Sequence, residues 1–184
     1  MIKVIFAVGD RGEFGYKGQL PWDHCKVDML HFMKYTKGCT VVMGRKTYES
    51  LPLSGLPNRE IVVMTNNRDK VRDRNLPCIS TEFLSGGGRS FPDFLVEWQE
   101  NGLGGDLIVI GGPSLILDAL KVADEVSLSF IHKDTPEPFD HDTFMDMGIL
   151  NYSLFSRFSR DSRNTPERFE DQPLVTFETW RVRE

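Results

Sequence analysis

Cysteine is scarce in this chain. The three cysteines, Cys25, Cys39 and Cys78, show none of the paired spacings of a disulfide framework. Reduced thiols are the simpler interpretation, and they predict a cytoplasmic protein. No two cysteines or histidines have the spacing of a metal site either, so no metal is expected.

Long apolar runs and an excess of positive charge are also missing. The first apolar run, residues 4–8, is far too short for a signal peptide or a membrane span. The formal net charge is -5 at pH 7. That charge argues against nucleic acids and anionic membranes as partners, because both favour a basic surface. The G-x-G-x-x-G fingerprint is absent too, which excludes the ordinary Rossmann dinucleotide motif.

The chain has the size and composition of one globular domain. Its 184 residues are 40% hydrophobic and 27% charged, enough to bury a sizeable core. We find no internal repeat and no linker that divides the chain, so residues 1–184 are expected to form a single domain. It would have insertions around 66–105 and 156–173. The polar segments 66–90 and 156–173 predict exposed loops.

Short apolar runs alternate with helical segments along the chain. Asp23 is a candidate N-cap for a helix that ends near Lys34, and further helices are predicted at 45–51, 92–100 and 113–120. The alternation predicts an α/β fold with a mostly parallel sheet. No helix is expected between the last strands, which indicates an antiparallel C-terminal hairpin. The predicted strands are 4–8, 40–43, 61–65, 107–110, 126–131 and 174–182.

Two predicted strands end at glycines where a helix begins. At the first junction Gly44 precedes Arg45 and Lys46, and at the second Gly111 and Gly112 precede Pro113. A helix start presents unpaired N–H groups and the positive end of its dipole, and glycines let a ligand approach the backbone. Two such junctions suit the pyrophosphate of a dinucleotide. A solvated basic turn and a plain tight turn are the alternative interpretations.

A carboxylate follows the Leu20-Pro21-Trp22 segment. Asp28 and Phe32 are four residues apart and therefore share one face of the predicted helix. A carboxylate beside apolar side chains is costly unless it has a partner. It could bind a cationic or amidine-like heterocycle, or it could be an ordinary exposed aspartate.

Together these motifs resemble the dihydrofolate reductase family. The resemblance implies a single domain with an eight-stranded sheet, about four flanking helices and a C-terminal antiparallel hairpin. It also implies an oxidoreductase that reduces 7,8-dihydrofolate to tetrahydrofolate with NADPH, in support of one-carbon metabolism and nucleotide synthesis. The expected partners are dihydrofolate and antifolates, and the expected state is a monomer. The matching segments, in the family's order, are 15–22, Asp28, Phe32, 43–51, 56–59, 110–112, 142–144 and 176–180.

The resemblance also implies substrate-binding residues. Asp28 would be the catalytic carboxylate that binds the pterin and helps N5 acquire a proton. Ser129 would hydrogen-bond Asp28 and the substrate, and Arg59 would bind the α-carboxylate of the glutamate tail. The other residues that the resemblance places at the substrate are Ile5, Phe6, Phe32, Ser50, Leu51, Leu56 and Ile110.

The resemblance implies a second set of residues for NADPH. Arg45, Lys46 and Thr47 would contact its phosphates, and a cis peptide would join Gly111 to Gly112 beneath the nicotinamide. The loop 15–20 would be a mobile lid. The remaining cofactor residues would be Ala7, Gly15, Gly18, Gln19, Leu20, Gly44, Met64, Thr65, Asn66, Ile110, Pro113, Ser114, Leu115, Ile116 and Thr143.

Several positions depart from the family pattern. Ile116 stands where an aromatic residue is usual, and Phe6 replaces a small residue on the first strand. Asn66 and Ser114 supply no charge to a 2′-phosphate, so a preference for NADPH over NADH depends on Arg45 and on the resemblance. The triplet at 86–88 does not open a helix after a strand, which predicts a flexible insertion and not a phosphate loop.

Two other functions compete with this interpretation. A reductase of related fold acting on a pyrimidine riboflavin precursor would not be expected to retain Trp22, Asp28 and Arg59 together. A non-catalytic descendant that serves as an interaction protein would be favoured by loss of Asp28 or of the Gly111-Gly112 pair, and the chain has all of them.

Overall fold

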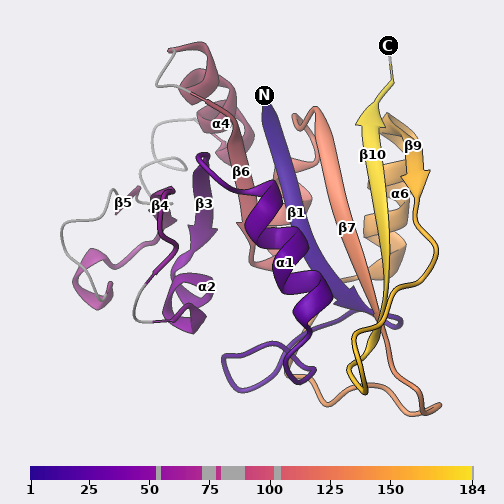
Figure 1. Cartoon of the computed structure of the whole chain (residues 1–184). Coiled ribbons are helices and arrows are strands. Elements are labelled where there is room, and N and C mark those ends of the chain that lie inside the picture. Colours follow the sequence, from indigo (N-terminus) through magenta and orange to yellow (C-terminus); the bar gives the residue numbers. More distant parts are fainter. Residues whose placement is uncertain (53–54, 72–77, 80–89, 102–104, 184) are drawn as a thin grey trace. The chain divides into compact units, whose positions relative to one another are not determined.

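The structure is a computed structural model of the chain, and it shows helices alternating with strands (Figure 1). Two compact units can be distinguished, and strand β1 (Ile2–Gly9) passes from the first into the second. The first unit comprises Met1–Val4 and Thr36–Asp124, and the second comprises Ile5–Tyr35 and Glu125–Glu184. The residues that the structure describes are 1–52, 55–71, 78–79, 90–101 and 105–183.

The first unit is built on parallel strands. Their hydrogen-bonded order is β5-β4-β3-β6-β1, and every pairing in this order is parallel. Val42, Val63 and Val109 are wholly buried, as expected for strands covered on both faces. These strands confirm the apolar runs read from the sequence. Their bounds are β3 (Thr40–Gly44), β4 (Glu60–Met64), β5 (Cys78–Ile79) and β6 (Leu107–Gly111).

Three α-helices of the first unit lie close to their predicted positions. They are α2 (Arg45–Ser50), α4 (Phe91–Glu100) and α5 (Pro113–Ala119). Ser90 and Asp93 form a reciprocal capping box at the start of α4, and their hydrogen bonds lower the pKa of Asp93.

The predicted loop 66–90 is not wholly irregular. It contains a short 3-10 helix, η1 (Arg68–Lys70), and strand β5, which pairs with β4. The glycine triplet at 86–88 lies outside the described residues.

The strands of the second unit are antiparallel after β1. Their order is β1-β7-β10-β9, with β7 (Glu125–His132), β9 (Phe158–Arg163) and β10 (Leu174–Val182). The predicted α/β class and the antiparallel C-terminal strands are therefore confirmed, and β10 has the predicted bounds. Two short strands that the sequence did not indicate, β2 (Glu13–Gly15) and β8 (Thr143–Phe144), pair with each other.

The expectation of no helix between the last strands is wrong, because α6 (Met147–Arg157) lies there. Asp146 caps it by accepting a hydrogen bond from the Ile149 N–H, and Leu150 and Leu154 are buried beneath it. Exposed apolar residues elsewhere on α6, such as Tyr152, blur the period that would have revealed it.

The prediction of an exposed loop throughout 156–173 is also wrong. Strand β9 occupies residues 158–163 and pairs with β10. Only Phe158 of this strand is buried, and its remaining residues are exposed. A charged, solvated edge strand has no apolar alternation, so its sequence is similar to that of a loop.

Helix α1 (Lys26–Tyr35) begins three residues after Asp23, so Asp23 is not its N-cap. Gln172 accepts a hydrogen bond from the Lys26 N–H at 2.6 Å and satisfies this end of the helix. The two residues are 146 positions apart, which is why local sequence could not identify the cap.

The strands of the second unit have a helix on each face (Figure 1). On one face His31 of α1 hydrogen-bonds Ser127 of β7 at 2.7 Å and packs against Phe177 of β10. On the other face Phe155 of α6 packs edge-on against Trp180 of β10, with 5.2 Å between ring centroids. Alternate strand residues therefore face different helices.

In the part of the chain that the structure describes, no helix is long and apolar enough to cross a membrane. The same residues contain no group of three or more histidine, cysteine, aspartate or glutamate side chains that could hold a metal ion.

Candidate active site

The residues that the sequence indicated fall into two sets, one in each unit. We call Asp28 and Ser129, with the residues around them, the carboxylate cluster of the second unit. We call Gly44, Thr47, Gly111 and Gly112 the glycine turn of the first unit. The second unit also contains Ile5, Phe6, Ala7, Gly15, Gly18, Gln19, Leu20, Phe32 and Thr143, and the other indicated residues belong to the first.

Asp28 lies in the first turn of α1, and Ser129 lies on β7. Burial raises the pKa of the Asp28 carboxyl, and the nearby Ser129 hydroxyl opposes part of that rise. The Ser129 hydroxyl is itself buried and meets strict hydrogen-bond geometry with no described residue. A desolvated carboxyl and an unsatisfied hydroxyl at one place are suited to a ligand with several N–H donors.

The other indicated residues of the second unit include apolar side chains. Ile5 and Phe6 on β1 are buried, and Phe32 on α1 is half-buried. Ala7 packs against a core cluster that includes Trp22. His31 adds little positive charge near neutral pH, because burial, reinforced by Lys34, lowers its pKa.

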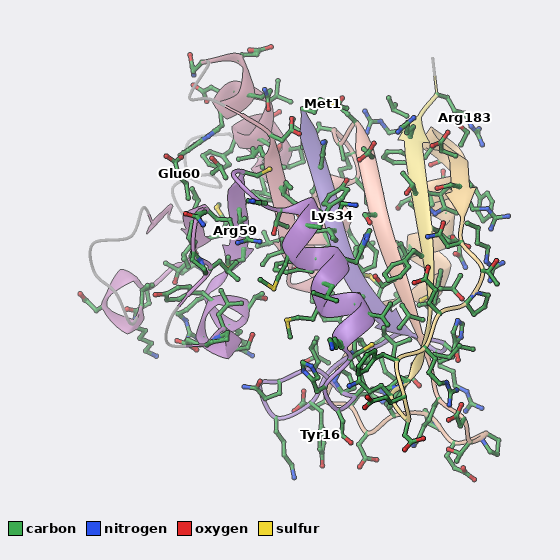
Figure 2. All side chains as sticks on the ribbon, in the orientation of Figure 1. Met1, Tyr16, Lys34, Arg59, Glu60 and Arg183 are labelled. Carbon is green, nitrogen blue, oxygen red and sulfur yellow. The ribbon has the colours of Figure 1, made fainter. Side chains whose placement is uncertain are left out.

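The segment 15–20 forms a tight turn. The backbones of Tyr16 and Gln19 exchange two hydrogen bonds of 2.9 Å, and Lys17 and Gly18 between them have positive φ (Figure 2). Leu20 is 51% exposed. The mobility of this segment stays a prediction.

Two acidic residues that the site prediction missed anchor this part of the chain. The Asp142 carboxylate accepts from the Lys17 N–H at 2.7 Å, and the Asp142 N–H donates to the Gly15 carbonyl. Glu13, only 2% exposed, accepts from the backbone N–H groups of Arg11 and Phe139. No local pattern in the sequence indicates the bonds from Lys17 to Asp142 and from Phe139 to Glu13, which join residues 125 and 126 positions apart. They place Thr143 beside Gly15 through the pairing of β2 with β8.

The glycine turn is closely packed. A cis peptide bond joins Gly111 to Gly112, as the resemblance implied. A Cβ atom added to Gly111 would lie 2.9 Å from Oγ1 and 3.2 Å from Cγ2 of Thr47, and one added to Gly44 would lie 3.5 Å from Leu115. The packing against Thr47 therefore requires glycine at position 111, and the glycines at both strand ends carry no side chain of their own toward a ligand.

The cations of α2 differ in their surroundings. Arg45 forms an ion pair of 2.6 Å with Glu49, one helical turn further on, whereas Lys46 is exposed. The Ser50 hydroxyl donates a hydrogen bond to the Thr47 carbonyl within the same helix, α2. A phosphate at Arg45 would share the guanidinium with Glu49.

Arg59 is held in a defined orientation just before β4 (Figure 2). Its Nε donates to Thr36 Oγ1 at 2.9 Å, and its Nη1 donates to the Pro57 carbonyl at 2.6 Å. These two contacts fix the orientation of the guanidinium, as bidentate recognition of a carboxylate requires. In the same unit three indicated residues pack beside a core cluster containing Met43 and Tyr48; they are Leu51, Leu56 and Ile110.

The remaining indicated residues of the first unit vary in exposure. Met64 and Thr65 are buried, and the Thr65 hydroxyl hydrogen-bonds the backbone of Asn67, while Asn66 is exposed. Ile116 is completely buried, as expected of a core residue of α5. Pro113 opens α5, and Ser114 in its first turn is exposed.

A desolvated carboxyl in one unit, and glycines at the ends of parallel strands in the other, are features of a nucleotide-dependent oxidoreductase. The family model for dihydrofolate reductase matches residues 1–181 of this chain. Two similar proteins are dihydrofolate reductase type A10 of Escherichia coli and the dihydrofolate reductase of Bacillus subtilis strain 168. The Escherichia coli protein is 31% identical to this chain, and the match covers 79% of this chain and 71% of the relative. The Bacillus subtilis protein is 30% identical, and the match covers 89% of this chain and 88% of the relative. The chain therefore belongs to the dihydrofolate reductase family and has dihydrofolate reductase activity.

A solved structure agrees on the fold. It is a dihydrofolate reductase from Enterococcus faecalis complexed with NADP(H) and RAB-propyl. The match covers 100% of this chain and 97% of the other, with a TM-score of 0.71 and 23% sequence identity.

Proposed function

We propose that Asp28 is the catalytic residue with which this enzyme reduces 7,8-dihydrofolate, using NADPH. The raised pKa of its carboxyl beside the unsatisfied Ser129 hydroxyl is the observation on which the assignment chiefly depends. An ionised Asp28 would accept hydrogen bonds from the 2-amino group and N3–H of the pterin, and Ser129 would bind the same ring.

The reaction adds a hydride to C6 of the pterin and a proton to N5. NADPH, when bound, supplies the hydride, and the protein supplies orientation and electrostatics. In this arrangement the Asp28 carboxylate accepts hydrogen bonds at the 2-amino group and N3–H, so it would not be the direct proton donor at N5. Its negative charge in a desolvated place raises the proton affinity of the ring, so that N5 takes its proton from water.

The cofactor is assigned to the first unit. Gly111, Gly112 and Gly44 would let the pyrophosphate approach the backbone, and Arg45 and Thr47 would bind its oxygens. The assignment is supported by the position of these glycines, which lie where strands β3 and β6 end and helices α2 and α5 begin. The segment 15–20 of the second unit, which is exposed at residues 17–20, would contact the nicotinamide.

Arg59 is assigned to the α-carboxylate of the glutamate tail. Its contacts with Thr36 and Pro57 support the proposal, because an arginine that is already oriented loses less entropy on binding. The apolar residues Leu51, Leu56 and Phe32 would pack against the benzoyl group.

We also propose a cytoplasmic monomer. The free thiols of Cys25 and Cys39 support a reducing compartment. Analytical ultracentrifugation tests the monomer, and subcellular fractionation tests the compartment.

The first experiment follows NADPH absorbance after dihydrofolate is added to the purified protein, with methotrexate as a control. Rapid decay that the inhibitor blocks is the expected result. A folded protein that binds NADPH without consuming it would overturn the proposal and favour an interaction protein.

A further inference from the structure

The second unit contains a cleft on the face of its strands opposite the carboxylate cluster. The volume of the cleft is about 280 Å³. Ser129 faces α1, whereas its neighbours Phe130 and His132 line the cleft on the α6 face. Because strand side chains alternate between faces, the cleft is separate from the carboxylate cluster of the same unit.

One end of the cleft is cationic. The guanidinium groups of Arg160 and Arg163 lie 3.0 and 3.4 Å from one oxygen of Glu178. The Glu178 side chain is 6% exposed, whereas the two arginine side chains are 45% and 54% exposed. Two cations therefore share one carboxylate, which leaves an excess positive charge facing the solvent-filled space.

The carboxylate of Glu178 is directed inward. Its second oxygen accepts a hydrogen bond from the indole N–H of Trp180 at 3.1 Å. Two guanidinium groups have ten N–H donors in total, more than one carboxylate can accept. A carboxylate is a chemical group that can replace water on the remaining donors of both guanidinium groups.

The walls of the cleft are aromatic. Phe155 stands edge-on to Trp180, and the Arg160 guanidinium lies 5.7 Å from the Trp180 ring centroid. Phe155 is 59% exposed although it is a large apolar side chain, and Phe130 lines the same space. An aromatic ring placed here would cover apolar surface that water now contacts.

The polar groups at the other end of the cleft are hydrogen-bonded to one another. His132 Nδ1 lies 2.7 Å from Asp10, and its Nε2 lies 2.8 Å from the Thr176 hydroxyl. Both ring nitrogens of His132 are therefore occupied, and Asp10 has a partner. The arginine end is where an anion would be bound.

We propose that this cleft is a binding site for a small aromatic carboxylate. The carboxylate pairs with Arg160 and Arg163, and the ring packs against the exposed Phe155 beside Phe130. The volume suits a ligand of a single ring and is below the usual range for drug-sized ligands.

The test is a titration of the full chain with benzoate, followed by NMR of protein labelled with ¹⁵N-tryptophan. The chain has three tryptophans, Trp22, Trp98 and Trp180, so the three indole N–H signals can be assigned from single Trp→Phe variants. The expected result is a saturable shift of the Trp180 signal with the Trp98 signal unchanged. A shift confined to Trp22, which belongs to the core cluster packed against Ala7, would overturn the cleft assignment.

Matched variants and ligands test the chemistry. Arg163→Gln should weaken benzoate about tenfold or more, since it removes one charge-assisted contact. Phe155→Leu should weaken it less. Arg168→Gln, which loses the same charge at an arginine paired with Asp134, should leave the affinity unchanged.

Other outcomes contradict the proposal. Equal affinity in Arg163→Gln and the unaltered chain, or equal displacement of benzoate by benzylamine, would exclude recognition of the carboxylate. Equal binding of sulfate at matched ionic strength would exclude recognition of the ring. Because every readout is benzoate binding at Trp180, the test is independent of whether the enzyme reduces dihydrofolate as proposed above.

Discussion

The glycine turn of the first unit and the carboxylate cluster of the second are suited to ligands in different ways. At Gly111 the important feature is the absence of side-chain atoms, since Thr47 occupies the space that a Cβ would need. At Asp28 it is a charge in a desolvated place. Substitutions in the first unit should therefore act through steric fit, whereas those in the second should act through proton affinity and hydrogen bonding.

The largest effect is expected from Asp28→Asn. The amide keeps the shape of the side chain and loses its charge, so kcat should fall by a factor on the order of 100 to 10,000. NADPH affinity should be nearly unchanged. Steady-state kinetics and NADPH fluorescence titration measure the two quantities.

Asp23→Asn is the matched control for that variant, because Asp23 is exposed and lies outside α1. It should have the activity of the unaltered enzyme. If Asp28→Asn lost turnover and NADPH affinity in parallel, substrate chemistry would not be confined to the second unit and cofactor binding to the first.

Arg59→Ala extends the comparison to a charge in the first unit. Loss of a bidentate charged contact should raise the KM for dihydrofolate about 10- to 100-fold. The KM for dihydropteroate, which lacks the glutamate, should stay the same. Lys37→Ala removes an exposed cation of the same unit and serves as the control. If both substrates were affected equally, Arg59 would not bind the tail.

Gly111→Ala tests steric fit together with backbone conformation, because Gly111 has a φ of 156°, so Thr47→Ala should relieve only the part of the loss due to the clash. The added methyl group would clash with Oγ1 and Cγ2 of Thr47, so the free energy of unfolding should fall by about 1–3 kcal/mol. Thr47→Ala removes both atoms and leaves Cβ 3.6 Å away, an ordinary contact distance. Urea unfolding of the unaltered chain, both single variants and the double variant gives a double-mutant cycle, which measures the coupling between the two positions. Additive losses would mean that this contact is not the source of the requirement for glycine.

A smaller effect is expected where α1 begins. Gln172→Ala removes the acceptor of the Lys26 N–H and should lower the free energy of unfolding by about 1 kcal/mol. Asp23→Ala should change it by less than about 0.5 kcal/mol, since Asp23 does not cap the helix. The opposite ranking in urea unfolding would restore Asp23 as the cap.

The smallest effect is a pH-dependent stability difference at Asp28. A pKa raised by folding means that the folded state prefers the protonated carboxyl, so ionisation at neutral pH costs stability. Asp28→Asn should therefore be more stable than the unaltered chain at pH 7. The difference should vanish below the unfolded aspartate pKa of about 3.9. Urea unfolding across this range checks the sign, and a less stable variant at pH 7 would contradict it.

The sequence predicted the regular strands and helices well where local pattern and environment agreed. Strand β10 has the predicted bounds, because its residues alternate between two packed faces. Helix α6 and strand β9 were missed because exposed apolar residues on the first, and exposed charges on the second, concealed the usual periods. The indicated site residues came from motifs in a fixed order, and their individual roles stay predictions.

The sequence by itself determined the family, the alternation of strands and helices, and the chemical types of the site residues. Only the tertiary structure decided what each group meets: the unsatisfied Ser129 hydroxyl beside Asp28, Thr47 against Gly111, Gln172 on the first turn of α1. The identity of a residue fixes its chemical groups, and the local pattern indicates which face of a helix or strand it lies on. Contacts between residues a hundred positions apart, and the desolvation that shifts a pKa, exist only once the chain has folded.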